Sequence, residues 1–235
     1  MASANWKKLQ IKEFNERWYY KKNRFAFSRR LDVVSRILSK FSQKLVLDVG
    51  TADGEIPVKL IKSGKFDSKI LGIDISRDLI YLAKKITKKY NLTERVQYII
   101  ADSEYLPFRD AIFNSIICTA VLEHLFNLQN SINEMSRACK EKKFIIITIP
   151  NFMYHNLLRF LAVLRLRYRD SVSDAKIRIE KLEEILSENK LNTIFRLNFV
   201  LPLPNFLNFV EKFLARLQIK GFHLLLNQLL ICKKE

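Results

Sequence analysis

Short apolar runs alternate with helix-like segments between residues 44 and 150. The runs are Leu45–Val49, Lys69–Ile73, Val96–Ile100, Ser115–Cys118 and Lys143–Ile149. Nearly continuous apolar runs are typical of parallel strands that are buried on both faces. The segments between them, Glu55–Ser63, Arg77–Tyr90 and Leu128–Cys139, carry apolar residues at helical spacing. The alternation predicts an α/β fold in which a doubly wound, mostly parallel sheet has helices on both faces.

The two ends of the chain depart from this rhythm. Residues 1–43 are rich in helix formers and predict an N-terminal helical cover over a main domain of residues 44–235. After Pro150, residues 151–174 predict a helical insertion or lid, and Ile177–Asn189 and Phe206–Leu217 predict helices. Leu191–Val200 and Phe222–Cys232 predict two further strands.

The charge balance bears on the partners of the protein. Lys plus Arg number 41 against 24 Asp plus Glu, a net charge of +17, which favours anionic partners such as RNA, an acidic lipid surface or a phosphorylated substrate. A solvated basic surface is the alternative explanation. The cysteines Cys118, Cys139 and Cys232 form no CxxC or Cys/His cluster, which predicts no metal site and a reducing compartment. We see neither a signal peptide nor an apolar stretch of membrane-spanning length, so we expect a cytoplasmic protein, with peripheral membrane contact left open.

A turn of small residues follows the first predicted strand. Asp48 lies near the end of that strand, and Gly50, Ala52 and Gly54 precede a predicted helix. Small residues let a backbone approach a ligand closely, and a helix N-terminus favours a negative group. Because many strand-to-helix turns contain glycine, this turn alone does not decide between a ligand site and a structural turn.

Polar residues also follow the next three predicted strands. Asp74 lies 20 residues beyond Gly54, where a carboxylate can accept hydrogen bonds from both hydroxyls of a ribose. A helix-capping role is its alternative. Asp102 and Ser103 follow the third strand and can contact the edge of an adenine, and a polar segment from Thr119 to Leu125 follows the fourth.

These four segments, in this order, resemble the cofactor motifs of class I S-adenosylmethionine-dependent methyltransferases, which have a Rossmann-like fold. The Thr-Ala-Val-Leu-Glu-His-Leu stretch of residues 119–125 resembles the small-molecule subgroup called type 11. The resemblance covers roughly residues 44 to 150 and implies a seven-stranded sheet whose last strand is antiparallel. It implies that S-adenosyl-L-methionine is bound by Asp48, Gly50, Thr51, Ala52, Gly54, Asp74, Ile75, Asp102, Ser103, Thr119 and Ala120.

The resemblance also implies a role for each segment. The turn would line the methionine portion, Asp74 would hold the ribose, and Ile75 would pack against the adenine. Thr119 and Ala120 would lie near the sulfonium. Asp48 would orient the turn or meet the cofactor's amino group through water. The chain departs from the family pattern at Ala52, where a glycine is usual, and at Asp53, which either caps the following helix or attracts the cofactor's ammonium.

No catalytic residue is evident from the pattern. Glu123 and His124 are weak candidates for a general base, because the resemblance favours a structural role for this pair in shaping the turn after the fourth predicted strand. His155 follows the fifth predicted strand and is a further candidate, whereas His223 is expected to be structural. Because the sulfonium is already activated, positioning alone can supply much of the rate enhancement.

Several activities fit these features. Methyl transfer to a small-molecule or lipid-like acceptor agrees with the type 11 resemblance and with the basic amphipathic stretches Tyr154–Arg169 and Phe206–Lys220. RNA methylation is the alternative, since Arg17–Arg30 mixes basic and aromatic residues, although the Asn/Asp-Pro-Pro-aromatic motif of base N-methylation is absent. A non-catalytic cofactor-binding scaffold and a nicotinamide dehydrogenase are further alternatives. The missing third glycine of GxGxxG argues against the dehydrogenase.

Overall fold

The computed structural model describes residues 5–9, 11–12, 24–40, 44–64, 66–151, 177–199 and 227–235. Its sheet has seven strands in the order β3-β2-β1-β4-β5-β7-β6. The strands are β1 (Leu45–Val49), β2 (Lys69–Asp74), β3 (Val96–Ile100), β4 (Phe113–Thr119), β5 (Cys139–Pro150), β6 (Leu191–Phe199) and β7 (Asn227–Lys234). Strands β1 to β5 are parallel, and β7 runs antiparallel to both β5 and β6. The predicted seven-stranded sheet with an antiparallel last strand is therefore confirmed.

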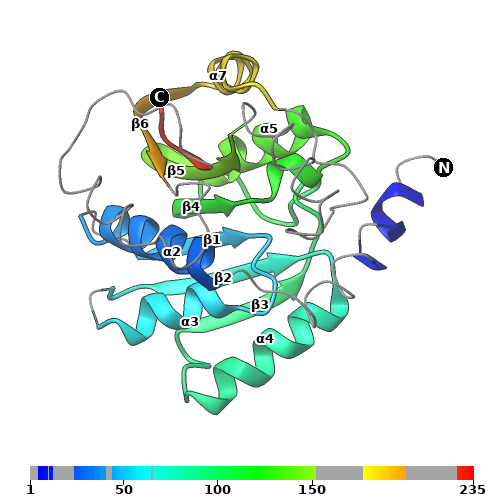
Figure 1. Ribbon diagram of the computed structural model, residues 1–235, viewed down its shortest axis with the longest axis vertical. Helices are drawn as coiled ribbons and strands as arrows, with labels where there is room; N and C mark the ends of the chain where they lie inside the picture. The colour runs from blue at the N-terminus through cyan, green and yellow to red at the C-terminus, as the bar shows by residue number, and fades with distance from the viewer. Residues whose placement is uncertain are drawn as a thin grey trace, which may run out of the picture.

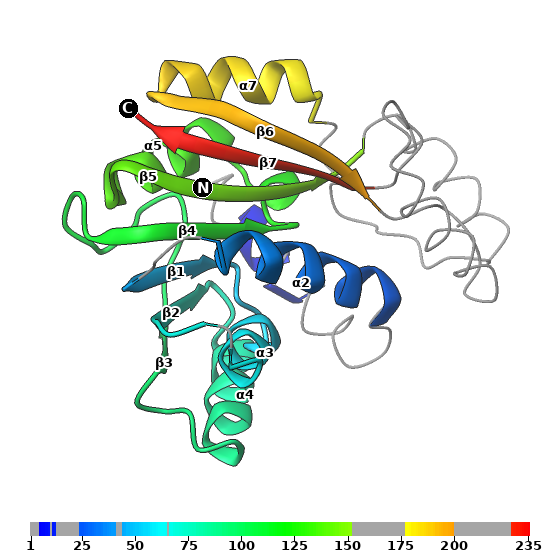
Figure 2. The same ribbon diagram turned by 90° about the vertical axis from the view of Figure 1, so that its left-hand side faces the viewer.

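Helices cover both faces of this sheet (Figures 1 and 2). They are α2 (Arg24–Leu38), α3 (Glu55–Lys62), α4 (Arg77–Lys89), α5 (Leu128–Ala138) and α7 (Ile179–Glu188), with a short 3₁₀ helix η1 (Leu122–His124). Helices α2, α3 and α4 share one apolar core with Val46 of β1, whereas α5 and α7 share the other core with Leu47. Consecutive strand residues thus serve opposite cores, as the two-residue period of a strand requires.

Local sequence signals set the helix ends. The hydroxyl of Ser76 accepts a hydrogen bond from the Leu79 N–H and so caps α4. The predicted helical segments Glu55–Ser63 and Arg77–Tyr90 end close to where they were expected to end, because the residues that follow them, Gly64 and Asn91, adopt left-handed φ angles of 66° and 55°.

Some predicted bounds were wrong. Strand β5 begins at Cys139, where a helix end was expected, because Cys139 pairs with Phe113 across an irregular register of β4. The predicted helical insertion of residues 151–174 and the predicted helix Phe206–Leu217 fall almost wholly outside the described residues.

Arg137 of α5 forms a clamp, a set of hydrogen bonds that holds the loop between β3 and β4 in place. Its guanidinium donates hydrogen bonds to the carbonyls of Leu106 and Phe108 at 3.1 and 2.7 Å. It also donates to Asp110 at 2.7 Å and to both carboxylate oxygens of Glu134 at 2.8 Å. Glu134 in turn accepts the Leu106 N–H at 2.7 Å, and its hydrogen bonds with Arg137 lower the pKa of its carboxyl. This loop begins with the predicted adenine-contacting residues, so the clamp also supports the site.

We expect Arg137→Ala to lower the free energy of unfolding by about 2 kcal/mol, because two loop carbonyls and two carboxylates lose a charged donor. Urea denaturation followed by circular dichroism measures the change. Arg109→Ala is the matched control, because Arg109 is an exposed arginine of the same loop. Its expected effect is within about 0.5 kcal/mol. Equal losses in the two variants would contradict the clamp.

Candidate functional site

The carboxyl ends of β1, β2, β3 and β4 bring the predicted motifs to one edge of the sheet. Parallel pairing in register places the ends of β1 and β2 side by side, with Val49 opposite Ile73, and those of β1 and β4, with Val49 opposite Cys118. Loops that follow neighbouring parallel strands meet at this edge, the usual ligand-binding position of such sheets. The segments after β1, β2, β3 and β4 therefore converge as expected.

Every second residue in the turn after β1 has a left-handed backbone conformation. Gly50, Ala52 and Gly54 have φ angles of 67°, 50° and 72°. Ala52 thus adopts the conformation that a glycine would take, at a cost of roughly 1 kcal/mol. Its N–H donates to Oδ2 of Asp74 at 3.0 Å. The carboxylate of Asp53 accepts the Glu55 N–H at the start of α3, as expected of a capping side chain.

The two glycines of this turn are required by packing inside the protein. A Cβ on Gly50 would lie 2.3 Å from Cγ2 of Val121, and a Cβ on Gly54 would lie 2.3 Å from the Tyr98 hydroxyl. We predicted small residues here to admit a ligand. The structure adds a second reason for small residues at these positions. The turn packs against Val121, which follows β4, and against Tyr98 of β3, and neither contact leaves space for a Cβ.

Asp74 links the turn after β1 to the start of α4. Its Oδ2 accepts the Ala52 N–H, and its Oδ1 accepts the Ser76 N–H at 2.9 Å. Burial raises the pKa of this carboxyl, while the hydrogen bonds from the backbone act in the opposite direction. Each oxygen retains acceptor capacity, which two ribose hydroxyls can use. Since Ser76 is the residue that caps α4, capping alone does not account for Asp74.

Asp48 is a buried carboxylate without a cationic partner. Its side chain is fully buried in the central strand β1, and within the described part of the chain no N–H group or cation hydrogen-bonds to its oxygens. Burial raises the pKa of Asp48 to about 7; the neighbouring Thr51 hydroxyl acts in the opposite direction, and the nearby charge of Asp74 acts in the same direction. A buried acid with no opposite charge beside it is costly, so this group suits a site where a cation binds.

The segment after β3 is already engaged by the N-terminus. Asp102 Oδ1 accepts the Glu104 N–H at 2.9 Å, and Lys7 Nζ donates to Asp102 Oδ2 at 2.6 Å. The same ammonium lies 2.7 Å from Oε2 of Glu104. Ser103 is buried beside them. Sequence reasoning missed Lys7 and Glu104, because an ion pair between residues 95 or more positions apart has no local signal.

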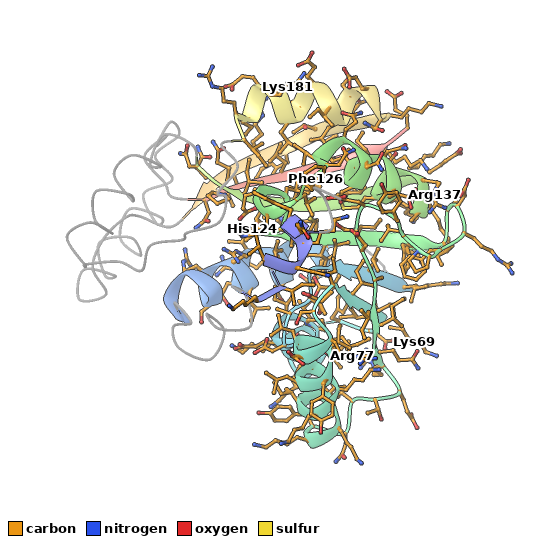
Figure 3. All side chains as sticks on the ribbon, turned by 90° about the vertical axis from the view of Figure 1, so that its right-hand side faces the viewer. Lys69, Arg77, His124, Phe126, Arg137 and Lys181 are labelled. Atoms are coloured by element: carbon orange, nitrogen blue, oxygen red, sulfur yellow. The ribbon has the colours of Figure 1, made fainter. Side chains whose placement is uncertain are left out.

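The segment after β4 contains the candidate proton acceptors. Thr119 is buried, and Ala120 has a left-handed φ of 54° with its N–H donating to the Thr148 carbonyl of β5. Glu123 is buried, and its Oε1 lies 4.0 Å from Nε2 of His124, which Figure 3 labels. His155 lies outside the described residues, as does His223.

Arg30 of α2 is a further charged residue that sequence reasoning missed. Burial lowers the pKa of its guanidinium, and the negative charge of Glu123 opposes that effect. Its Nε is shielded from solvent and has no acceptor among the described residues. A buried donor of this kind, close enough to Glu123 to sense its charge, is available to an anionic group.

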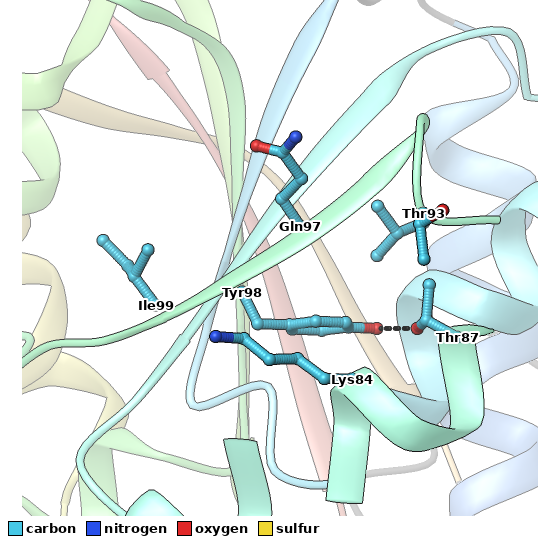
Figure 4. Close-up of a pocket in the computed structure, with 7 residues that line it drawn as sticks. Lys84, Thr87, Thr93, Gln97, Tyr98 and Ile99 are labelled. Carbon is cyan, nitrogen blue, oxygen red and sulfur yellow. Dashed lines mark hydrogen bonds between the residues drawn. The ribbon is translucent and has the colours of Figure 1, made fainter. Parts of the chain in front are cut away.

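Ile75 is half-buried directly after β2. A pocket of about 310 Å³ lies between α4 and β3, where the Tyr98 hydroxyl and Thr87 Oγ1 are 2.9 Å apart (Figure 4). None of the predicted cofactor residues lines it.

The described residues contain no cluster of three His, Cys, Asp or Glu suited to a metal ion. No described helix has both the length and the apolarity of a membrane span.

Comparison with known proteins identifies a methyltransferase domain in this chain. A methyltransferase domain family matches residues 40–198. An uncharacterized protein of Methanocaldococcus jannaschii is 32% identical over 153 residues, which cover 60% of this chain and 61% of the relative. The ubiquinone biosynthesis O-methyltransferase of Rickettsia prowazekii is 26% identical over 161 residues, covering 64% and 62% of the two chains. The matches thus span less than two thirds of these relatives.

A solved structure shows the same fold. Geranyl diphosphate C-methyltransferase from Streptomyces coelicolor A3(2), in complex with Mg²⁺, geranyl diphosphate and S-adenosyl-L-homocysteine, superposes with a TM-score of 0.64. Its sequence identity is 13%, and the alignment covers 88% of this chain and 80% of that one. With the domain match over more than half of its length, this chain belongs to the class I S-adenosylmethionine-dependent methyltransferase family.

Proposed function

We propose that this protein transfers the methyl group of S-adenosyl-L-methionine to a small-molecule or lipid-like acceptor. The observation that carries the proposal is the pair of carboxylates at the ends of β1 and β2. Asp48 is buried with no N–H group or cation bound to its oxygens, and Asp74 holds the turn between them through the Ala52 N–H. A cationic nucleoside cofactor supplies what both groups lack, a positive charge for Asp48 and ribose hydroxyls for Asp74.

The remaining residues would hold the other parts of the cofactor. The turn from Gly50 to Gly54 would border the methionine portion, because it lies between Asp48 and Asp74 in the chain and joins them in space. Ile75, Asp102 and Ser103 would surround the adenine. When bound, the cofactor supplies a methyl group on a sulfonium that an acceptor displaces in line.

The protein's own contribution is positioning. Thr119 and Ala120 would border the reacting centre, with buried Glu123 and half-buried His124 a few residues further along the chain. For a hydroxyl acceptor, this pair and His155 are the candidates for taking the proton. The exclusion of water strengthens each electrostatic contact in such a site.

The acceptor class rests on charge and on the relatives. Curated relatives include quinone-biosynthesis methyltransferases, and geranyl diphosphate is bound by a structural neighbour. A net charge of +17 favours an acceptor with an anionic group, and the buried Nε of Arg30 offers one donor for it. The same charge is the argument for RNA as the alternative acceptor. Residues 1–43 as a cover and 151–174 as an insertion or lid remain predictions within this proposal.

Isothermal titration with S-adenosyl-L-methionine tests the cofactor, with NADH as the control. We expect saturable binding of the first and none of the second. A tritium-transfer assay then compares an isoprenoid quinol, a prenyl diphosphate and total RNA as acceptors. A folded protein that does not bind S-adenosyl-L-methionine would overturn the proposal, and methylation of RNA alone would replace the small-molecule acceptor by the alternative.

A further inference from the structure

The N-terminal segment is attached to the candidate cofactor site by one lysine. Lys7 lies in a short helical segment of residues 5–9, and its ammonium is 2.6 Å from Asp102 Oδ2 and 2.7 Å from Glu104 Oε2. It also lies 5.4 Å from the centre of the Tyr105 ring. In Figure 3 this N-terminal segment lies beside the labelled His124, in agreement with its contacts to the loop after β3.

This ion pair differs from an ordinary surface salt bridge. The side chains of Lys7, Asp102 and Glu104 are only 19%, 26% and 3% exposed. Fully exposed pairs contribute little, because water and salt screen them. Removing the cation from a buried carboxylate, in contrast, leaves a charge that solvent does not compensate. Separating Lys7 from Asp102 and Glu104 therefore costs free energy.

Glu104 extends the contact to the segment after β4. Its Oε1 accepts the N–H groups of Phe126 and Asn127, both at 2.9 Å. Asn127 caps α5, and Phe126 lies two residues beyond His124. Lys7 is thus connected, through Glu104, to the loop that carries the candidate proton acceptors as well as to the predicted adenine edge.

We propose that Lys7 is a positioning residue that holds the N-terminal segment closed against the adenine side of the cofactor site. It acts through Asp102 and Glu104, and its release is a step in the exchange of the cofactor and its product. The proposal rests on the proposed function for the identity of the ligand. Trp6 supports the closure, because its indole Nε1 is shielded from solvent when the segment lies in this position.

The release rate of the cofactor tests this proposal. Full-length protein is loaded with tritiated S-adenosyl-L-methionine, diluted into excess unlabelled cofactor and sampled by rapid filtration. We expect Lys7→Met to release the cofactor at least tenfold faster than the unmodified protein. Raising the salt from 0.05 to 0.5 M should speed release from the unmodified protein, and it should have much less effect on the variant.

Two controls separate positioning from a general effect. Lys8→Met makes the same substitution at the neighbouring, exposed lysine and should change the rate by less than twofold. Lys7→Arg keeps the charge and should restore the rate to within about threefold. A Trp18→Phe background leaves Trp6 as the sole tryptophan of the sequence. Acrylamide should quench the fluorescence of Trp6 more strongly when Lys7→Met is added to this background.

The outcomes distinguish this proposal from the proposed function. Equal release from Lys7→Met and Lys8→Met, with normal binding by the unmodified protein, would overturn the role of Lys7 and leave the methyltransferase proposal intact. If the folded, unmodified protein does not bind S-adenosyl-L-methionine, both proposals fall together.

Discussion

Asp74→Ala is expected to weaken S-adenosyl-L-methionine binding by about a hundredfold or more. The substitution removes the acceptors of the Ala52 and Ser76 N–H groups, which hold the turn after β1 against the start of α4. It also removes the proposed acceptors of the ribose hydroxyls. Two charge-assisted hydrogen bonds at about 1.5 kcal/mol each amount to about 3 kcal/mol, or two powers of ten in Kd. Isothermal titration measures the change.

The control for this experiment is Asp78→Ala. Asp78 is exposed in the first turn of α4, four residues from Asp74, so its loss should alter Kd by less than threefold. Circular dichroism and a thermal melt establish that each variant is folded. If Asp74→Ala binds as tightly as the unmodified protein while remaining folded, the ribose assignment is wrong.

Asp48→Asn is expected to make the unliganded protein more stable at pH 8 and less able to bind its cofactor. Burial raises the pKa of Asp48 from the ordinary 3.8 to about 7, so the folded state keeps its proton where the unfolded chain has lost it. The free energy of unfolding therefore falls as pH rises from about 4 to about 7 and then levels off. At 1.36 kcal/mol per pKa unit, this group contributes a fall of about 4 kcal/mol, which the asparagine variant lacks.

Urea denaturation at pH 5, 6, 7 and 8, without ligand, measures this difference in slope. Asp67→Asn is the matched control, because Asp67 is fully exposed and the slope should stay as in the unmodified protein.

Cofactor affinity supplies the second readout. A cation favours the ionised form of Asp48, so affinity should rise with pH through about 7 in the unmodified protein and should lose that rise in Asp48→Asn. Parallel stability curves for the protein and Asp48→Asn would refute the assignment.

The two expectations have opposite consequences for stability. Asp74 is satisfied by backbone N–H groups in the unliganded protein, whereas Asp48 is not. Loss of Asp74 should therefore weaken both the turn and cofactor binding. Loss of the Asp48 carboxylate should raise the free energy of unfolding and lower the affinity for the cofactor. Residues held unsatisfied in the folded state are characteristic of functional sites.

Local sequence patterns were sufficient for the fold class and for most of the strands. The apolar runs from Leu45 to Ile149 identified five parallel strands, because burial on both faces leaves no polar alternation. The turn from Gly50 to Gly54 and the acid at Asp74 were identifiable, because positive φ angles and helix starts have strong local preferences. Strand bounds were less well determined, as the early start of β5 at Cys139 shows, because a strand's ends depend on its partner.

The sequence by itself thus determined the α/β class, the order of its elements and the acids that end its first three strands. Only the tertiary structure decided which of these acids have partners. Asp48 is fully buried in the central strand with no cationic partner, and Asp102 is paired because Lys7 reaches it across 95 residues. Arg30, Glu104 and Arg137 acquired their roles in the same way. Burial and ion pairing depend on contacts between distant segments, and no local period or motif encodes such contacts.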